Sequence, residues 1–194
     1  MAFSALLDAC VLVPSALRDM LLELGAASAY RPLWSERIES EVARAITRVR
    51  RRRGGDSEET AAYVKRLMRQ MNAALPDARV VGWEGFEQRS PQGPDPNDRH
   101  VVAAAMCGRA DVIVTFNLKD FPESALPGEL FAQHPDEFLC DLLDLNPQLV
   151  VGSMSSIVAR TGRKGPKWIM RDLLARLERE SVGGFVAEFL GVVD

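Results

Sequence analysis

Residues 95–121 read DPNDRHVVAAAMCGRADVIVTFNLKDF: a polar opening, then a small-residue apolar segment, then a β-branched run. The spacing of apolar positions predicts a helix over residues 97–109, and the run at residues 112–115 is typical of a buried parallel strand. The chain opens in a similar way, with an apolar strand over residues 3–8 and an amphipathic helix over residues 15–28. Strands alternating with helices predict an α/β fold, with a parallel sheet covered by helices on both faces.

Further elements lie between these two units. Residues 30–34 form a short extended piece, and Ser35 is placed to cap a following helix. Its apolar positions recur at helical spacing: Ile38, Val42, Ala45, Ile46 and Val49. A second helix over residues 57–74 would complete a helical hairpin, and residues 77–83 (DARVVGW) read as another buried strand before a Gly/Pro-rich loop.

From Pro135 onward the pattern contains helices alone. We therefore expect an α/β domain over residues 1–134 and an α-helical C-terminal extension over residues 135–194. With 194 residues, of which 47% are apolar and 26% charged, the composition is that of a globular protein with one main core.

Charge and cysteine content exclude several classes of protein. The apolar N-terminal stretch lacks a basic start and is interrupted by Asp8 and Pro14, so we expect neither a signal peptide nor a membrane span, and a cytoplasmic protein. Three widely spaced cysteines predict buried thiols rather than disulfides, and the two histidines form no zinc motif.

A net charge of −3 argues against a protein covered in positive potential, but arginines gather at residues 48–53. Such a cluster can hold phosphates, and it can also be a solvated helix end that complements the helix dipole before Gly54 and Gly55. The pattern favours the helix end, because charge runs are usually solvated.

The acids of DPND have two interpretations. Asp95 can be a helix N-cap, with Pro96 as the first helical residue and Asp98 as the third, which is a favourable capping arrangement. At 100° per residue, however, Asp98 lies near the centre of the apolar face of that helix. Burying a carboxylate costs free energy unless helix N–H groups or a metal ion compensate it.

Other polar residues follow the predicted strands. Asp8 closes the first strand, and Thr115, Asn117 and Asp120 follow the run at residues 112–115. Each is an ordinary turn residue when taken alone, but the carboxyl ends of parallel strands are where ligands bind in such sheets. Carboxylates gathered there would repel one another, and Mg²⁺ or Mn²⁺ would compensate an all-oxygen site.

A further acid comes from the helix after Ser35. Glu39 and Glu41 flank its apolar stripe on opposite sides at similar angles, whereas Glu36 lies well away. Periodicity does not choose between Glu39 and Glu41.

The ordered segments LLDACVL, SERIESE, DPNDRHVVAAA and ADVIVTFNLKDFP resemble the PIN-domain ribonucleases, especially bacterial VapC-like proteins, over residues 3–133. The resemblance implies a Rossmann-like parallel sheet and an acidic site for Mg²⁺ or Mn²⁺. It assigns the metal and the catalysis to Asp8, Glu41, Asp98 and Asp120. Thr115 matches the supporting hydroxyl, and Asn117 stands beside the metal where many relatives carry an aspartate.

The resemblance also implies an activity: hydrolysis of RNA phosphodiester bonds, leaving a 5′-phosphate and a 3′-hydroxyl. VapC-like proteins are toxins of toxin-antitoxin pairs, so a VapB-like antitoxin and a homodimer are the expected partners. The C-terminal extension, which starts within the segment HPDEFL (residues 134–139), resembles that of a subgroup of PIN-domain proteins. Two alternatives stay open: a PIN nuclease of RNA processing, and a catalytically silent RNA- or protein-binding module.

Two other classes of protein also place an aspartate at the end of a Rossmann-like strand. Haloacid-dehalogenase phosphatases need a second aspartate two residues later, where this chain has Cys10, and receiver domains need an acidic pair before the strand-end aspartate. The sequence meets neither requirement.

Overall fold

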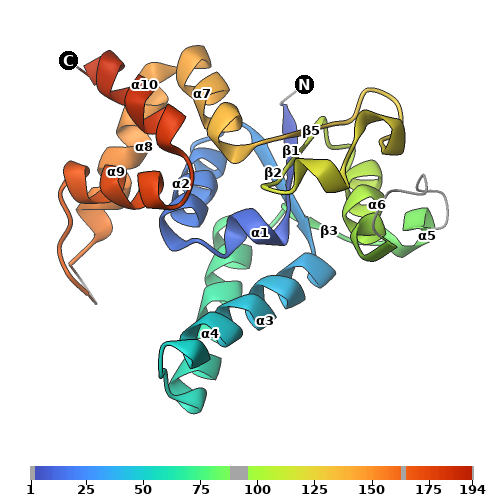
Figure 1. Ribbon diagram of the computed structural model, residues 1–194, viewed down its shortest axis with the longest axis horizontal. Helices are drawn as coiled ribbons and strands as arrows, with labels where there is room; N and C mark the ends of the chain where they lie inside the picture. The colour runs from blue at the N-terminus through green and yellow to red at the C-terminus, as the bar shows by residue number, and fades with distance from the viewer. Residues whose placement is uncertain (1–2, 88–95, 163–164, 194) are drawn as a thin grey trace.

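The computed structural model describes residues 3–87, 96–162 and 165–193. Within these ranges five strands form one parallel sheet in the order β3-β2-β1-β4-β5 (Figure 1). The strands are β1 Ser4–Leu7, β2 Arg31–Ser35, β3 Arg79–Val80, β4 Val112–Val114 and β5 Phe131–Gln133. The predicted α/β class with a parallel sheet is confirmed.

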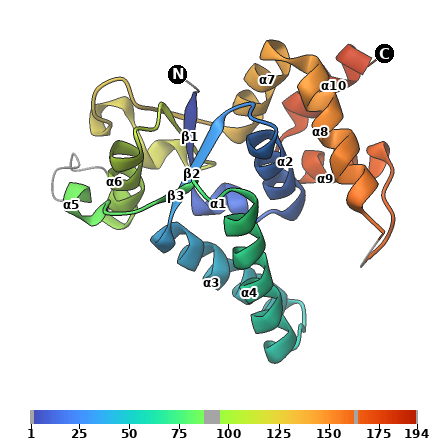
Figure 2. The ribbon, with the colours of Figure 1, turned by 180° about the vertical axis from the view of Figure 1, so that it is seen from behind.

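Helices lie on both sides of the sheet, with α5 and α6 on one side and α2 with the C-terminal helices on the other (Figures 1 and 2). The helices are α1 Ala9–Leu12, α2 Ser15–Ala26, α3 Glu36–Arg52, α4 Ser57–Ala74, α5 Glu84–Glu87, α6 Arg99–Gly108, α7 Pro135–Leu145, α8 Pro147–Arg160, α9 Met170–Arg179 and α10 Gly183–Val193. Short 3₁₀ turns complete the fold: η1 Pro96–Asp98, η2 Leu118–Asp120 and η3 Glu123–Ala125. Over the described ranges, no helix combines the length and apolar character needed to cross a bilayer.

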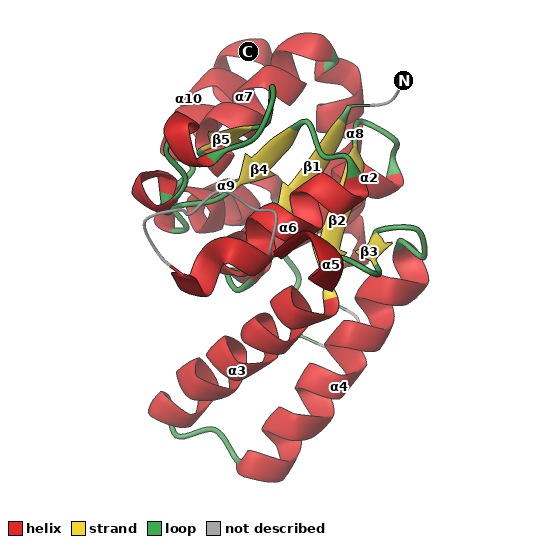
Figure 3. Ribbon diagram, turned by 90° about the vertical axis from the view of Figure 1, so that its right-hand side faces the viewer, coloured by secondary structure: helices red, strands yellow, loops and turns green. Residues whose placement is uncertain are grey.

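Local sequence explains the longest pair of helices. Ser35 Oγ accepts from the Ile38 N–H at 3.2 Å and begins α3 as predicted, and Asp56 accepts from two N–H groups at the start of α4. The predicted hairpin is confirmed, and α3 and α4 project from the sheet as an antiparallel arm (Figure 3).

The strand order reverses at β1. The chain passes from β1 to β2 and β3 on one side, then crosses to β4 and β5 on the other. Ligands bind in such sheets beyond the carboxyl ends of the strands at this reversal. Asp8 follows β1 there, and its N–H continues the ladder to the Val114 carbonyl of β4 at 3.1 Å.

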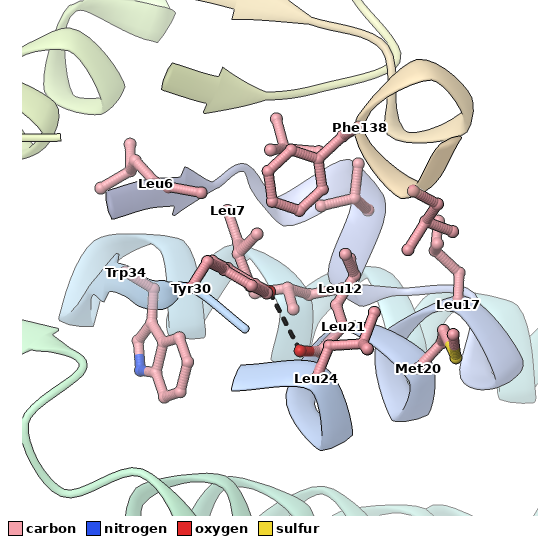
Figure 4. Packing of buried hydrophobic residues seen from close by; sticks show 14 of the residues in the cluster. Leu6, Leu7, Leu12, Leu17, Met20, Leu21, Leu24, Tyr30, Trp34 and Phe138 are labelled. Atoms are coloured by element: carbon pink, nitrogen blue, oxygen red, sulfur yellow. Dashed lines mark hydrogen bonds between the residues drawn. The ribbon is translucent and has the colours of Figure 1, made fainter. Parts of the chain in front are cut away.

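The C-terminal helices confirm the predicted helical extension and share the core of the sheet domain. Phe138 of α7 is 1% exposed and meets Tyr30 edge to face, with ring centroids 5.0 Å apart. Tyr30 in turn donates to the Leu21 carbonyl of α2 at 3.0 Å (Figure 4). A 2.7 Å ion pair between Arg160 of α8 and Glu23 of α2 adds a polar link. The boundary at residue 134 stays a prediction.

Two expectations need correction, and two short elements were not predicted. The strand expected over residues 77–83 is limited to β3, because Gly82 adopts a left-handed φ of 76° and Val81 is 77% exposed. Neither β5 nor α1 was predicted from the sequence. The three thiols predicted to be buried, Cys10, Cys107 and Cys140, are free and only half-buried.

Because α7 completes the core beneath β1 and β2, Phe138→Ala should lower the free energy of unfolding by about 3–5 kcal/mol. Leu145→Ala in the same helix is the matched control, since Leu145 is 79% exposed. Urea denaturation followed by circular dichroism measures both, and we expect a single transition. Equal stability of the two variants would contradict the shared core.

Candidate functional site

Two residues at the strand-order reversal form the centre of the candidate site. Asp8 is 7% exposed and Thr115 is fully buried, and the Thr115 hydroxyl donates to Asp8 Oδ2 at 2.7 Å. The Ala9 N–H donates to Asp8 Oδ1 at 2.6 Å, so Asp8 also caps α1. Hydrogen bonds thus hold both carboxylate oxygens in place and reduce the cost of burying the charge.

Cys10 makes further contacts with this pair. Its thiol donates to Asp8 Oδ2 at 3.0 Å and accepts from the Phe116 N–H at 3.3 Å. Burial, together with the charge of Asp8, raises the pKa of Cys10 to about 12, so the thiol stays protonated at neutral pH. Cys10 therefore serves as a hydrogen-bond donor to Asp8 and links the segments after β1 and β4.

Glu41 of α3 reaches across to α6. Glu41 Oε1 lies 3.0 Å from Nε2 of His100, which is 1% exposed, and Arg37 and Arg44 lie 3.7 Å away. Burial raises the pKa of Glu41, but the hydrogen bond and charge of His100 and the two arginines outweigh it, so the pKa is lowered. Glu41 is accordingly ionised at neutral pH and is fixed to α6 at the same edge of the sheet as Asp8.

Glu39 takes a different direction. It is 8% exposed, and its Oε1 accepts from Trp34 Nε1 at 2.8 Å and from Asn72 Nδ2 at 2.9 Å, which joins β2, α3 and α4. Arg79 lies 3.7 Å from the second oxygen. These contacts give Glu39 a structural place between α3 and α4, away from the contact of Glu41 with His100.

The remaining predicted site residues lie around the same edge. Asp98 ends η1 and stands at the N-cap position of α6, where it is half-buried and makes no capping hydrogen bond to the helix. This corrects the expectation of a regular α-helical turn, because residues 96–98 form a 3₁₀ turn before α6, whereas the placement of Asp98 above the core stays a prediction. Asp120 is half-buried in η2, and Asn117 is exposed, with its N–H donating to the Thr115 hydroxyl at 3.1 Å. The predicted cap Asp95 lies outside the described residues.

The predicted acids do not yet form a closed cluster. Among the residues that the structure describes, no three His, Cys, Asp or Glu side chains converge as a metal-binding group. The donors are nevertheless all oxygens, and Asp8, Asp98 and Asp120 follow β1, precede α6 and follow β4 at one edge of the sheet. In chemical type the set fits Mg²⁺ or Mn²⁺.

The sequence did not predict the contact of His100 with Glu41 or the hydrogen bonds that Cys10 makes with Asp8 and Phe116. His100 stands two residues after Asp98 and faces Glu41, and Trp83 packs against its ring at 6.1 Å. The sequence places His100 directly after the polar residues that begin α6, and only its contact with Glu41 of α3 reveals its role.

Comparison with known proteins agrees with this fold. Residues 4–119 match the PIN domain family, and residues 135–190 match the family described as VapC50 C-terminal domain. The chain therefore belongs to the PIN-domain family, as the sequence motifs predicted.

A particular relative matches part of the chain. A 49-residue segment is 63% identical to "Putative ribonuclease VapC50" from Mycobacterium tuberculosis (strain ATCC 25618 / H37Rv). The match covers 25% of this chain and 29% of that relative, so the chain matches less than a third of the relative's length. No solved structure matches the chain.

The contacts of Glu39 lead to a stability prediction. Glu39→Ala should lower the free energy of unfolding by about 1–3 kcal/mol, because it leaves the buried Trp34 N–H without its acceptor. Glu36→Ala, at a position whose side chain is 77% exposed, is the control and should change stability by less than about 0.5 kcal/mol. Urea unfolding monitored by Trp fluorescence measures both, and an unchanged midpoint for Glu39→Ala would refute the structural role.

Proposed function

We propose that this protein is a metal-dependent endoribonuclease that hydrolyses RNA phosphodiester bonds. The observation that carries the proposal is the Asp8 carboxylate held by the Thr115 hydroxyl at 2.7 Å where the strand order reverses. The PIN-domain match and a relative whose name includes ribonuclease support it.

In this proposal Asp8, Glu41, Asp98 and Asp120 hold Mg²⁺ or Mn²⁺, and Asn117 contributes beside them. When bound, such a cation activates a water molecule and neutralises the charge that develops on the phosphate. Thr115 and Cys10 orient Asp8, and His100 orients Glu41. Helix α6 therefore positions two acids, Asp98 through its own N-terminus and Glu41 through His100.

The open arrangement of the acids is consistent with this role. Carboxylates that share a site repel one another until a cation neutralises them. We therefore propose that the acids gather fully when the metal binds.

The direct test is RNA cleavage. Purified protein should cleave RNA in Mg²⁺ or Mn²⁺ and lose the activity in EDTA, and Asp8→Asn and Asp98→Asn should each reduce the rate by about 100-fold or more, because each removes charge needed to stabilise the transition state. Asp144→Asn, at an exposed position of α7, is the matched control. Gel analysis of product ends should show 5′-phosphates.

Full-rate cleavage by Asp8→Asn or Asp98→Asn would remove that residue from the mechanism. Cleavage that persists in EDTA would refute the metal dependence.

A second prediction concerns the Thr115 hydroxyl. Thr115→Val should weaken Mn²⁺ binding by about 10–100-fold, because Asp8 loses the donor that orients it, whereas Thr115→Ser should retain most of the affinity. Isothermal titration calorimetry measures both variants without RNA. Equal affinities for Thr115→Val and Thr115→Ser would show that the hydroxyl does not support the site.

We further propose that the protein is a cytoplasmic toxin of a VapBC-like pair, that it binds a VapB-like antitoxin, and that it forms a homodimer. The VapC50 matches support this biological role. The same matches support a division into a PIN domain over residues 1–134 and a helical extension over residues 135–194, since α7 begins at Pro135.

A catalytically silent PIN-like binding module is the second candidate. One observation favours it: Asn117 provides no carboxylate where many PIN-domain relatives carry an aspartate. A silent module would neither bind Mn²⁺ through Asp8 nor cleave RNA, so the two experiments above distinguish the candidates.

A further inference from the structure

The helical arm carries a charge opposite to that of the rest of the protein. Residues 36–74, which comprise α3, α4 and their connection, contain ten basic and six acidic side chains, a net charge of +4, whereas the whole chain has a net charge of −3. The remaining residues therefore carry −7. Such segregation creates a local positive potential on an acidic protein and attracts polyanions to one surface.

The basic side chains of α3 fall into two groups. Arg50 faces α4, where its Nε donates to Thr60 at 3.3 Å and its guanidinium lies 4.7 Å from the Tyr63 ring centroid. Its role is to join the two helices. Arg44, Arg48, Arg51 and Arg52 are exposed and lie within about 100° of the helix circumference at 3.6 residues per turn. We call these four residues the α3 arginine face.

The α3 arginine face is largely without acidic partners. Over the described residues, Arg48, Arg51 and Arg52 form no ion pair with a carboxylate, and Arg44 pairs only with Glu41, at 3.7 Å. Unneutralised arginines that lie close together repel one another, and a bound anion would relieve that repulsion. The helix-end interpretation accounts for Arg51 and Arg52, which lie with Arg50 in the last turn of α3, but not for Arg44 and Arg48.

The surface beside these arginines is hollowed. Ala43 and Thr47, which have small side chains, line a hollow of about 570 Å³ together with the four arginines. Thr47 turns its hydroxyl back to the Ala43 carbonyl at 2.8 Å and leaves the space open. Arginines around a shallow floor offer bidentate donors to successive phosphate groups.

Glu41 continues the α3 arginine face toward the candidate site. Glu41 lies on the same side of α3 as the arginine face, one turn before Arg44, and contacts His100 of α6. Figure 3 shows α3 running outward from the region beneath α6. A chain of phosphates on this face would thus approach the edge of the sheet where the predicted acids lie.

We propose that the α3 arginine face binds the phosphate backbone of a single RNA strand and directs it to the acidic site. This inference rests on the proposed ribonuclease function and assigns it a substrate-binding surface. Successive turns of α3 place Arg44, Arg48 and Arg51 in a line along the helix. The contacts are to phosphates, so the surface contributes affinity without reading the base sequence.

The test measures RNA binding without cleavage. A fluorescent twelve-nucleotide RNA is titrated in EDTA with the full chain, with Arg48→Ala/Arg51→Ala, and with the matched control Arg171→Ala/Arg179→Ala on the exposed side of α9. The first double variant should bind about tenfold more weakly, and its slope of log K against log salt should fall by about 1.4, since single-strand binding loses about 0.7 per phosphate contact.

Three further comparisons make the result specific. Arg48→Lys/Arg51→Lys should keep most of the salt slope, oligo-U and oligo-A should lose affinity equally, and thermal melts of all variants should coincide. In cleavage assays the Ala variant should raise KM at unchanged kcat, because it removes binding common to the ground and transition states.

An unchanged RNA affinity and salt slope for Arg48→Ala/Arg51→Ala would overturn the inference. An equal loss of RNA affinity in the control variant would overturn it as well. Binding of an acidic protein to this face, with no binding of RNA, would also contradict it. The binding assay in EDTA does not depend on turnover. RNA binding through this face with no cleavage in Mn²⁺ would therefore refute the nuclease proposal alone.

Discussion

The hydrogen bond from Thr115 to Asp8 joins the two strand ends between which the chain reverses its direction across the sheet. Both residues are buried because β1 and β4 are central strands, so a carboxylate at this point needs fixed donors. Thr115, Ala9 and Cys10 supply them. The orientation of the candidate site therefore depends on the register of β1 against β4, which pairs Leu7 with Val114.

The other elements hold acids around this point. Helix α3 begins at Ser35 and brings Glu41 to α6, and α6 begins after Asp98. The C-terminal helices act from the opposite side of the sheet, where Phe138 fills the core beside Tyr30. The extension thus supports the scaffold of the site through packing, and its links to α2 through Glu23 and Leu17 fix that helix.

Much of this could be predicted from the sequence because periodicity and turn chemistry are local signals. The strand before Asp8, the cap at Ser35 and the second helix of the arm were all predicted and are confirmed, whereas the site at the carboxyl ends of the strands stays a prediction. Short elements were harder to predict from the sequence. Strand β5 has only three residues and is not buried, and Gly82 ends β3 early through a backbone conformation that the apolar pattern does not reveal.

The details of the site required tertiary contacts. Glu39 and Glu41 are equivalent by helical angle, and only the donors Trp34 and Asn72 on one side and His100 on the other distinguish them. The arginine cluster at residues 48–53 likewise required tertiary contacts for its interpretation. Its sequence favours a solvated helix end, and the fold separates Arg50, which packs on α4, from the exposed arginines.

We propose that Asp8 is a metal ligand at the strand-order reversal. Anomalous diffraction from crystals grown with Mn²⁺ tests it most directly. We expect a manganese peak at about 2.1 Å from an Asp8 oxygen, the distance expected for a small hard cation bound by carboxylates, with Asp98 or Asp120 contacting the same ion. Manganese bound elsewhere, with Asp8 still contacting only Thr115, Ala9 and Cys10, would contradict it.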